Sequence, residues 1–114
     1  MTQEDKELLL KDICGRLPYG VKVQDIYYKS LEPAPIWLID INAQNVRMFA
    51  DEGYQSIEYI RPYLFPLSNV VEEIVTTSNK HIAVNVDFFH KNHIDYRGLI
   101  QKGLALDATG LNIY

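Results

Sequence analysis

Three side chains that could bind a metal ion follow one another near the C-terminus at intervals of three residues. They are Asp87, His90 and His93, and a further carboxylate, Asp95, comes two residues later. Imidazole nitrogens and carboxylate oxygens are common zinc ligands. On a helix, however, six residues turn by about 600°, which leaves Asp87 and His93 about 120° apart. These residues are therefore weak metal candidates. We expect both histidines to be solvated at the end of a short helix, and we predict no metal and no cofactor.

Nucleophilic catalysis would need Cys14 or Ser68 beside a histidine. Cys14 falls on the predicted buried stripe of a helix, where a thiol is usually inert. Ser68 has a sufficient role as a helix cap. The chain has no G-x-S-x-G elbow, no glycine-rich phosphate loop and no H-E-x-x-H. The sequence therefore disfavours an enzyme without excluding one. A small metal-dependent enzyme or metal-binding protein centred on His90, His93 and Asp95 stays open as an alternative.

A second group of residues points to binding. Tyrosine and arginine are enriched at binding hot spots, and Tyr96 and Arg97 follow Asp95 directly. The structural alternative makes Asp95 a helix cap, Arg97 an ion-pair partner and Tyr96 a packed ring with its hydroxyl at the surface. A sheet with one core also leaves some aromatic residues exposed. The predicted binding residues are Tyr96, Arg97, Asp95, Tyr59 and Trp37.

Composition limits what these residues can belong to. The chain has 114 residues, of which 47% are hydrophobic and 23% charged, and this predicts one globular domain, 1–114. A net charge of -4 with scattered basic residues disfavours nucleic-acid binding. The single cysteine, the lack of a signal-peptide pattern and the lack of an apolar run of roughly 18 residues predict a cytoplasmic protein away from membranes.

The first 62 residues change from helical to strand periodicity. An N-terminal helix is predicted over 1–18, with Thr2 as its cap, Leu17 on its apolar stripe and Pro18 ending it. An antiparallel sheet is predicted over 19–62, because apolar residues then alternate. Its expected strands are 21–28, 36–42, 46–50 and 54–60. Strand 36–42 is predicted to be central, the prolines of 31–35 to keep that segment a loop, and Pro62 to end the last strand.

The remaining residues, 63–114, are predicted to cover this sheet. Residues 63–67 are expected to connect, Ser68 to cap a second helix, and a short helix to span 86–93 with its phenylalanines buried. Asp95 would cap a further short helix that ends at Gly103, and the tail could add an edge strand. The fold class is therefore α+β. It is either a four- to five-stranded antiparallel meander or a small SH3-like open barrel, with short C-terminal helices.

Three blocks of the chain resemble one protein family. The longest is DFFHKNHIDYRGLIQKGLALDA at 87–108, and the others are RLPYGVKVQ at 16–24 and IRPYLFPLSN at 60–69. The family consists of small uncharacterised bacterial and prophage-type proteins with a C-terminal H-x-DYRGLIxKGLA pattern. The resemblance implies a compact domain of mobile-element origin and transfers no catalytic residue. His90 stands where the pattern leads us to expect an Asn-like residue.

These observations favour a noncatalytic interaction or accessory protein. Its partner would be another protein or a second copy of itself, bound through an aromatic sheet face or through Tyr96 and Arg97. An SH3-like nucleic-acid binder that stacks bases on its tyrosines is a further alternative.

Overall fold

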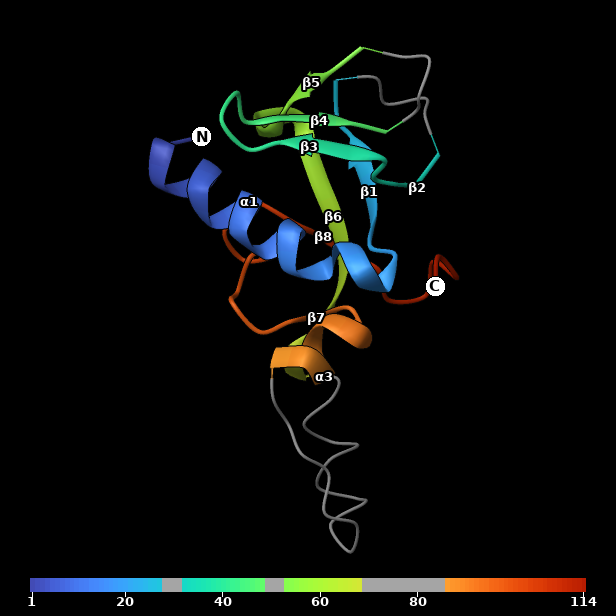
Figure 1. The fold of residues 1–114 in the computed structure, drawn as a ribbon. Coiled ribbons are helices and arrows are strands. Elements are labelled where there is room, and N and C mark those ends of the chain that lie inside the picture. The colour runs from blue at the N-terminus through green and yellow to red at the C-terminus, as the bar shows by residue number, and fades with distance from the viewer. Residues whose placement is uncertain (28–31, 49–52, 69–85) are drawn as a thin grey trace, which may run out of the picture.

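The computed structural model describes residues 1–27, 32–48, 53–68 and 86–114, and it has an α+β fold (Figure 1). An N-terminal helix lies across a five-stranded sheet, and a smaller three-stranded sheet lies beyond one end of it. This confirms the predicted fold class. The described strands form two separate sheets and no closed barrel. None of the helices found in these ranges could cross a membrane, being too short or too polar.

Helix α1, Gln3–Arg16, begins as the sequence predicts. The Thr2 hydroxyl accepts a hydrogen bond from the Asp5 backbone N–H at 3.1 Å, and the Asp5 carboxylate accepts one from the Thr2 N–H at 3.2 Å. This capping box satisfies two of the N–H groups that a helix start leaves unpaired. Leu9 and Ile13 are fully buried against the sheet. Leu17 was expected on the same stripe, but it is exposed because the α-helix ends one residue earlier.

The larger sheet is built around β6, Ile60–Pro66 (Figure 1). It pairs antiparallel with one strand and parallel with two others, which makes the sheet mixed. The antiparallel strands are β1, Lys22–Asp25, and, beyond it, β2, Ala34–Pro35; the parallel strands are β7, Ile94–Asp95, and β8, Leu106–Asp107. The tail therefore does contribute an edge strand, as predicted.

The sequence prediction was wrong at two prolines of this sheet. Pro62 was expected to end a strand and 63–67 to be a connector, yet Pro62 lies inside β6, opposite Val23 of β1. The predicted boundary between sheet and cover at residue 62 thus falls inside the central strand. Pro35 was expected in a loop, yet it pairs with Lys22 in β2. β2 is an edge strand, and proline is tolerated there because no ladder N–H is needed on the outer side.

The smaller sheet is an antiparallel meander of β3, Leu38–Asp40, β4, Asn45–Arg47, and β5, Gln55–Ser56. The meander prediction is therefore confirmed in part. β3 was expected to be the central strand of a larger sheet and is instead an edge strand. A short 3-10 helix, η2, Ile57–Tyr59, leads from β5 into β6.

One hydrophobic core joins α1 to the sheets and to the C-terminal loops. Its buried members are Leu9, Leu10, Ile13, Val21, Val23, Val46, Ile57, Ile60, Leu64, Leu99, Leu104 and Ala105. Helix α3, Val86–Lys91, lies at the end of the molecule away from the three-stranded sheet (Figure 1). The expected helix after Asp95 is instead a series of turns over 98–103. The predicted second helix and the extended piece before α3 lie largely outside the described residues.

Candidate functional site

A pair of opposite charges is fully buried on α1. Asp12 and Arg16 are one helical turn apart, and both side chains have no exposed surface. The Arg16 Nε donates to the Asp12 carboxylate at 2.7 Å, and its Nη2 donates to the Ile94 carbonyl of β7 at 2.6 Å. Its remaining nitrogen, Nη1, is buried without a hydrogen-bond partner. The pair fastens α1 to β7, because neither charge could stay buried alone.

Arg97, predicted to bind a partner, completes this arrangement. Its Nε donates to the second Asp12 oxygen at 3.1 Å, so Asp12 carries two arginines. We name Asp12, Arg16 and Arg97 the buried charge cluster. Both guanidinium groups also lie over the Tyr96 ring, at 5.5 Å for Arg16 and 4.8 Å for Arg97. Such cation–π contacts favour the same packing.

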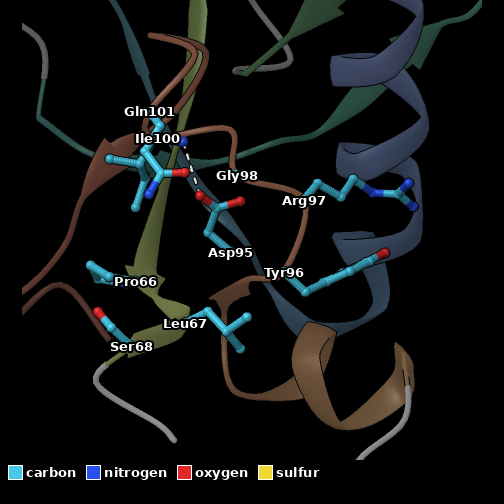
Figure 2. A pocket seen from close by; sticks show the side chains of 9 residues that line it. All are labelled: Pro66, Leu67, Ser68, Asp95, Tyr96, Arg97, Gly98, Ile100 and Gln101. Carbon is cyan, nitrogen blue, oxygen red and sulfur yellow. Dashed lines mark hydrogen bonds between the residues drawn. The ribbon is translucent and has the colours of Figure 1, made fainter.

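Asp95 was expected to cap a helix, and its carboxylate instead binds backbone N–H groups of the turns that take the place of that helix. Its two carboxylate oxygens accept hydrogen bonds from the Leu99 and Ile100 backbone N–H groups, both at 2.9 Å. A cavity of about 500 Å³ lies between this loop and the end of β6 (Figure 2). In Figure 2 the Tyr96 and Arg97 side chains point from the loop toward α1 and not toward Pro66. The charged groups that line the cavity are thus bonded within the chain, which leaves little chemistry for a ligand there.

His90 is buried, not solvated as predicted. Its imidazole lies against α1 at Gly15, where an added Cβ would come within 2.5 Å of the ring. Its Nε2 is 3.0 Å from the Tyr96 hydroxyl, so that hydroxyl is bound to His90 and not at the surface. Burial, followed by the nearby positive charge of Arg16, lowers the pKa of His90. His90 therefore serves as a neutral packing and hydrogen-bonding group between α3 and α1.

His93 differs from the prediction in a similar way. Its ring stacks on Tyr114 with centroids 3.6 Å apart, and its buried Nδ1 has no hydrogen-bond partner. Burial and the charge of Arg16 lower the pKa of His93 to about 4, so it is neutral near pH 7. Across the described ranges, no three side chains of His, Cys, Asp and Glu come together as metal ligands. Asp87, His90 and His93 thus do not form the weakly predicted metal site.

A different group of aromatic and basic side chains lies on the three-stranded sheet. The Arg47 guanidinium of β4 lies 5.2 Å from the Trp37 ring centroid and 5.6 Å from that of Tyr54. Trp37 is 57% exposed and Tyr54 is 46% exposed. Leu38, which pairs with Arg47 across the sheet, is also exposed. We name Trp37, Leu38, Arg47 and Tyr54 the aromatic–arginine patch.

Tyr59, another predicted binding residue, belongs to a separate contact. Its ring meets the exposed ring of Tyr27 edge to face, with centroids 5.3 Å apart. A hydrogen bond to the Glu58 side chain and the charge of Glu58 raise the pKa of Tyr59. The structure therefore distributes the predicted binding residues over three places: Trp37 in the aromatic–arginine patch, Tyr59 beside Tyr27, and 95–97 against α1.

In the part of the chain that the structure describes, neither imagined nucleophile lines its pocket together with a histidine. Cys14 is half-buried and lines an open groove with Leu10 and Ile41, and burial raises the pKa of its thiol. A raised pKa keeps the thiol protonated and weakly nucleophilic. Ser68 is exposed at the rim of the cavity beside Asp95. Within the described residues, no hydrogen bond joins Ser68 to His93.

Sequence reasoning missed Asp12 and Arg16. An Asp followed four residues later by an Arg is an ordinary surface pair on a helix, and such pairs usually stay in water. The available signal was their position: Asp12 directly precedes Ile13 on the buried side of α1, and Arg16 follows it by three residues. Charged residues so close to an apolar stripe could have been recognised as candidates for burial.

Comparison with known proteins adds no relative. No family model matches the chain, and neither a curated protein nor a solved structure resembles it significantly.

Proposed function

We propose that this protein is a noncatalytic interaction protein and that it binds its partner through the aromatic–arginine patch. The observation that carries the proposal is the exposure of Trp37 beside Arg47 and Tyr54. Tryptophan, tyrosine and arginine are the residue types most enriched at binding hot spots. Tryptophan is highly buried on average, and exposed apolar residues that adjoin one another mark interaction sites more than single ones do.

Burial supports this patch over the Tyr96 and Arg97 alternative. Arg97 is tied to Asp12 and Tyr96 to His90, so a partner would have to compete with contacts inside the chain. Trp37 and Tyr54 offer large rigid surfaces that need little rearrangement, which lowers the entropic cost of binding.

A photoreactive amino acid in place of Leu38 tests the proposal in the host that carries the protein. The matched control replaces Lys91 of α3, which is also exposed but lies at the opposite end of the molecule (Figure 1). We expect a protein adduct at position 38 that is absent at position 91. Irradiation that yields no adduct at position 38, or only a nucleic-acid adduct, would overturn the proposal.

Affinity measurements with the purified, identified partner give the quantitative test. Trp37→Ala should weaken binding by about 30-fold or more, as expected for a hot spot. The control is Leu111→Ala, which removes an exposed leucine from the C-terminal tail. An equal effect of both substitutions would show that the patch has no special role.

We further propose that the protein works in the cytoplasm and derives from a mobile element. The single Cys14 and the resemblance of 87–108 to prophage-type proteins support this. Cell fractionation with an antibody against the chain tests the first part, and recovery of the protein outside the cytoplasmic fraction would refute it. Genes for phage or transposition proteins beside its own gene would support the second, and an isolated housekeeping context would contradict it.

A further inference from the structure

Among the described strands, one edge of β3 is open, and the side chains of the aromatic–arginine patch do not account for this. In the part of the chain that the structure describes, β3 pairs with β4 alone. An edge strand presents N–H and C=O groups that can pair with another strand. Proteins usually protect such edges with lysine, proline or a bulge. β3 has no lysine and no proline, and it is flanked by Trp37 and by Ile41, which is 65% exposed.

We propose that β3 pairs with β3 of a second copy of this chain, antiparallel and with Ile39 opposite its own counterpart. The inference rests on the proposed function and names the partner. A two-fold axis perpendicular to the sheet would join two three-stranded sheets into one six-stranded sheet. Self-complementary contacts of this kind are the usual basis of homodimers.

The side chains around Ile39 suit this register. Trp37 would lie opposite Ile41 of the second copy, so that two exposed apolar residues cover each other. The two-fold axis repeats the same contact on the other side of Ile39. Apolar cross-strand pairs stabilise a sheet, so both Trp37–Ile41 pairs would stabilise this register.

Opposite charges would also share a row across the joined sheets. Arg47 lies opposite Leu38 within one sheet, and Leu38 would lie opposite Asp40 of the second copy. Leu38 would therefore lie between the positive Arg47 of its own sheet and the negative Asp40 of the second copy. The symmetry gives two such rows, and charge complementarity of this kind fixes register more than it adds affinity.

Neighbouring registers fit less well. A shift by two residues in one direction puts Asp40 opposite Asp40 of the second copy, and like charges directly opposite are destabilising. A shift by two residues in the other direction puts Asp40 opposite Ile36, and Ile41 opposite Pro35, which has no N–H to donate. A shift by one residue would turn the outer face of one sheet to the inner face of the other.

The pairing strand is short, so the dimer should be transient. Interfaces built on few backbone hydrogen bonds belong to the small, weak class. We expect sedimentation equilibrium of the full chain to show a dimer fraction that rises between about 10 µM and about 1 mM. Asp40→Lys, which reverses one charge in each row, should lower the association constant by about tenfold or more. A chain that stays monomeric throughout this range would overturn the proposal.

Disulfide trapping tests the register. Two variants, Leu38→Cys and Asp40→Cys, are made separately in a Cys14→Ser background, so that only the new thiols can react. In the proposed register position 38 faces position 40 of the second copy, within the range that a disulfide spans. Position 38 lies diagonally from its own counterpart, and so does position 40, too far for a disulfide. A mixture of the two variants should therefore form a covalent dimer under oxidised glutathione.

The separate variants are the matched controls. A covalent dimer from Leu38→Cys alone or from Asp40→Cys alone would indicate one of the shifted registers and overturn the proposal. Both positions are exposed, so the variants should fold, and wild-type sedimentation gives a readout that needs no variant. A monomer that still forms a photoadduct with a different protein at position 38 would overturn self-pairing and leave the proposed function standing.

Discussion

Arginine and aromatic side chains meet in two regions of this protein, with opposite surroundings. In the buried charge cluster, Arg16 and Arg97 share Asp12 and lie over Tyr96, and Arg16 has no exposed surface. In the aromatic–arginine patch, Arg47 contacts two aromatic residues that are about half exposed. The first set of contacts holds elements of the chain together, whereas the second leaves apolar surface exposed. Residue types alone do not distinguish these roles, and burial does.

The largest expected effect is loss of the carboxylate in the buried region. Asp12→Ala leaves two arginines without their shared partner, and one of them is fully buried. Breaking a buried ion pair on one side costs about 3–5 kcal/mol. Urea denaturation should show this loss in the free energy of unfolding. A control, Glu7→Ala on the exposed side of α1, should change it by about 0.5 kcal/mol or less. If Asp12→Ala were as mild, the cluster would not hold α1.

The second effect tests how closely α3 approaches α1. In an exposed helix Gly15→Ala would stabilise by about 1 kcal/mol. Here the new Cβ meets the His90 ring, which Tyr96 holds in place, so we expect destabilisation of about 1–3 kcal/mol. Thermal or urea unfolding gives the sign directly. In a double-mutant cycle, Gly15→Ala should cost less in a His90→Ala background. A stabilising Gly15→Ala in the wild type would contradict the packing.

A third, moderate effect concerns pH. The pKa of His93 is about 4 in the folded chain and about 6.5 when unfolded, so the unfolded chain binds the proton more readily. The contribution of His93 to stability is then present above pH 6.5 and is lost as the pH falls from 6.5 to 4. Unfolding free energies measured across this range should drop for the wild type. His93→Asn should flatten the drop, and asparagine tolerates the positive φ of 58° at this position. An unchanged slope would mean that another group titrates.

The smallest effect is expected in the exposed region. Trp37→Ala removes a large ring, yet the unfolding free energy should change by only about 1 kcal/mol because more than half of the residue is exposed. Urea denaturation of Trp37→Ala and Asp12→Ala in parallel compares the loss of unfolding free energy in the two regions directly. A loss of 2 kcal/mol or more for Trp37→Ala would place the ring among the structural residues and weaken the proposed function.

The parts of the fold that local chemistry determines were predicted well. The cap at Thr2, the start of α1 and the short helix near residue 86 all depend on neighbours within five residues. The predicted central position of β3 was wrong because a strand with apolar residues on both faces can lie at the centre of a sheet or at its edge. Burial patterns within a sequence do not separate these two cases.

The misses at β6 and His90 have a different origin. Pro62 reads as a strand terminator, and only the pairing with Val23 shows that its missing N–H is tolerated. His90 reads as a polar helix end, and its burial depends on the absent side chain of Gly15, seventy-five positions earlier. The proposed binding residues were harder still: Trp37 was chosen for its type, and nothing in the sequence predicted that Arg47 and Tyr54 would lie beside it.

The bond between Arg16 and the Ile94 carbonyl joins residues 78 positions apart. During synthesis at about 5–20 residues per second, roughly 4–16 s pass before the acceptor of that bond leaves the ribosome. For that time α1 carries a charge that must eventually enter the core, and a helix of 14 residues is marginal in water by itself. Pairing of the Arg16 guanidinium with β7 is therefore a late event. The chain must be translated almost to its end before that group meets its second acceptor.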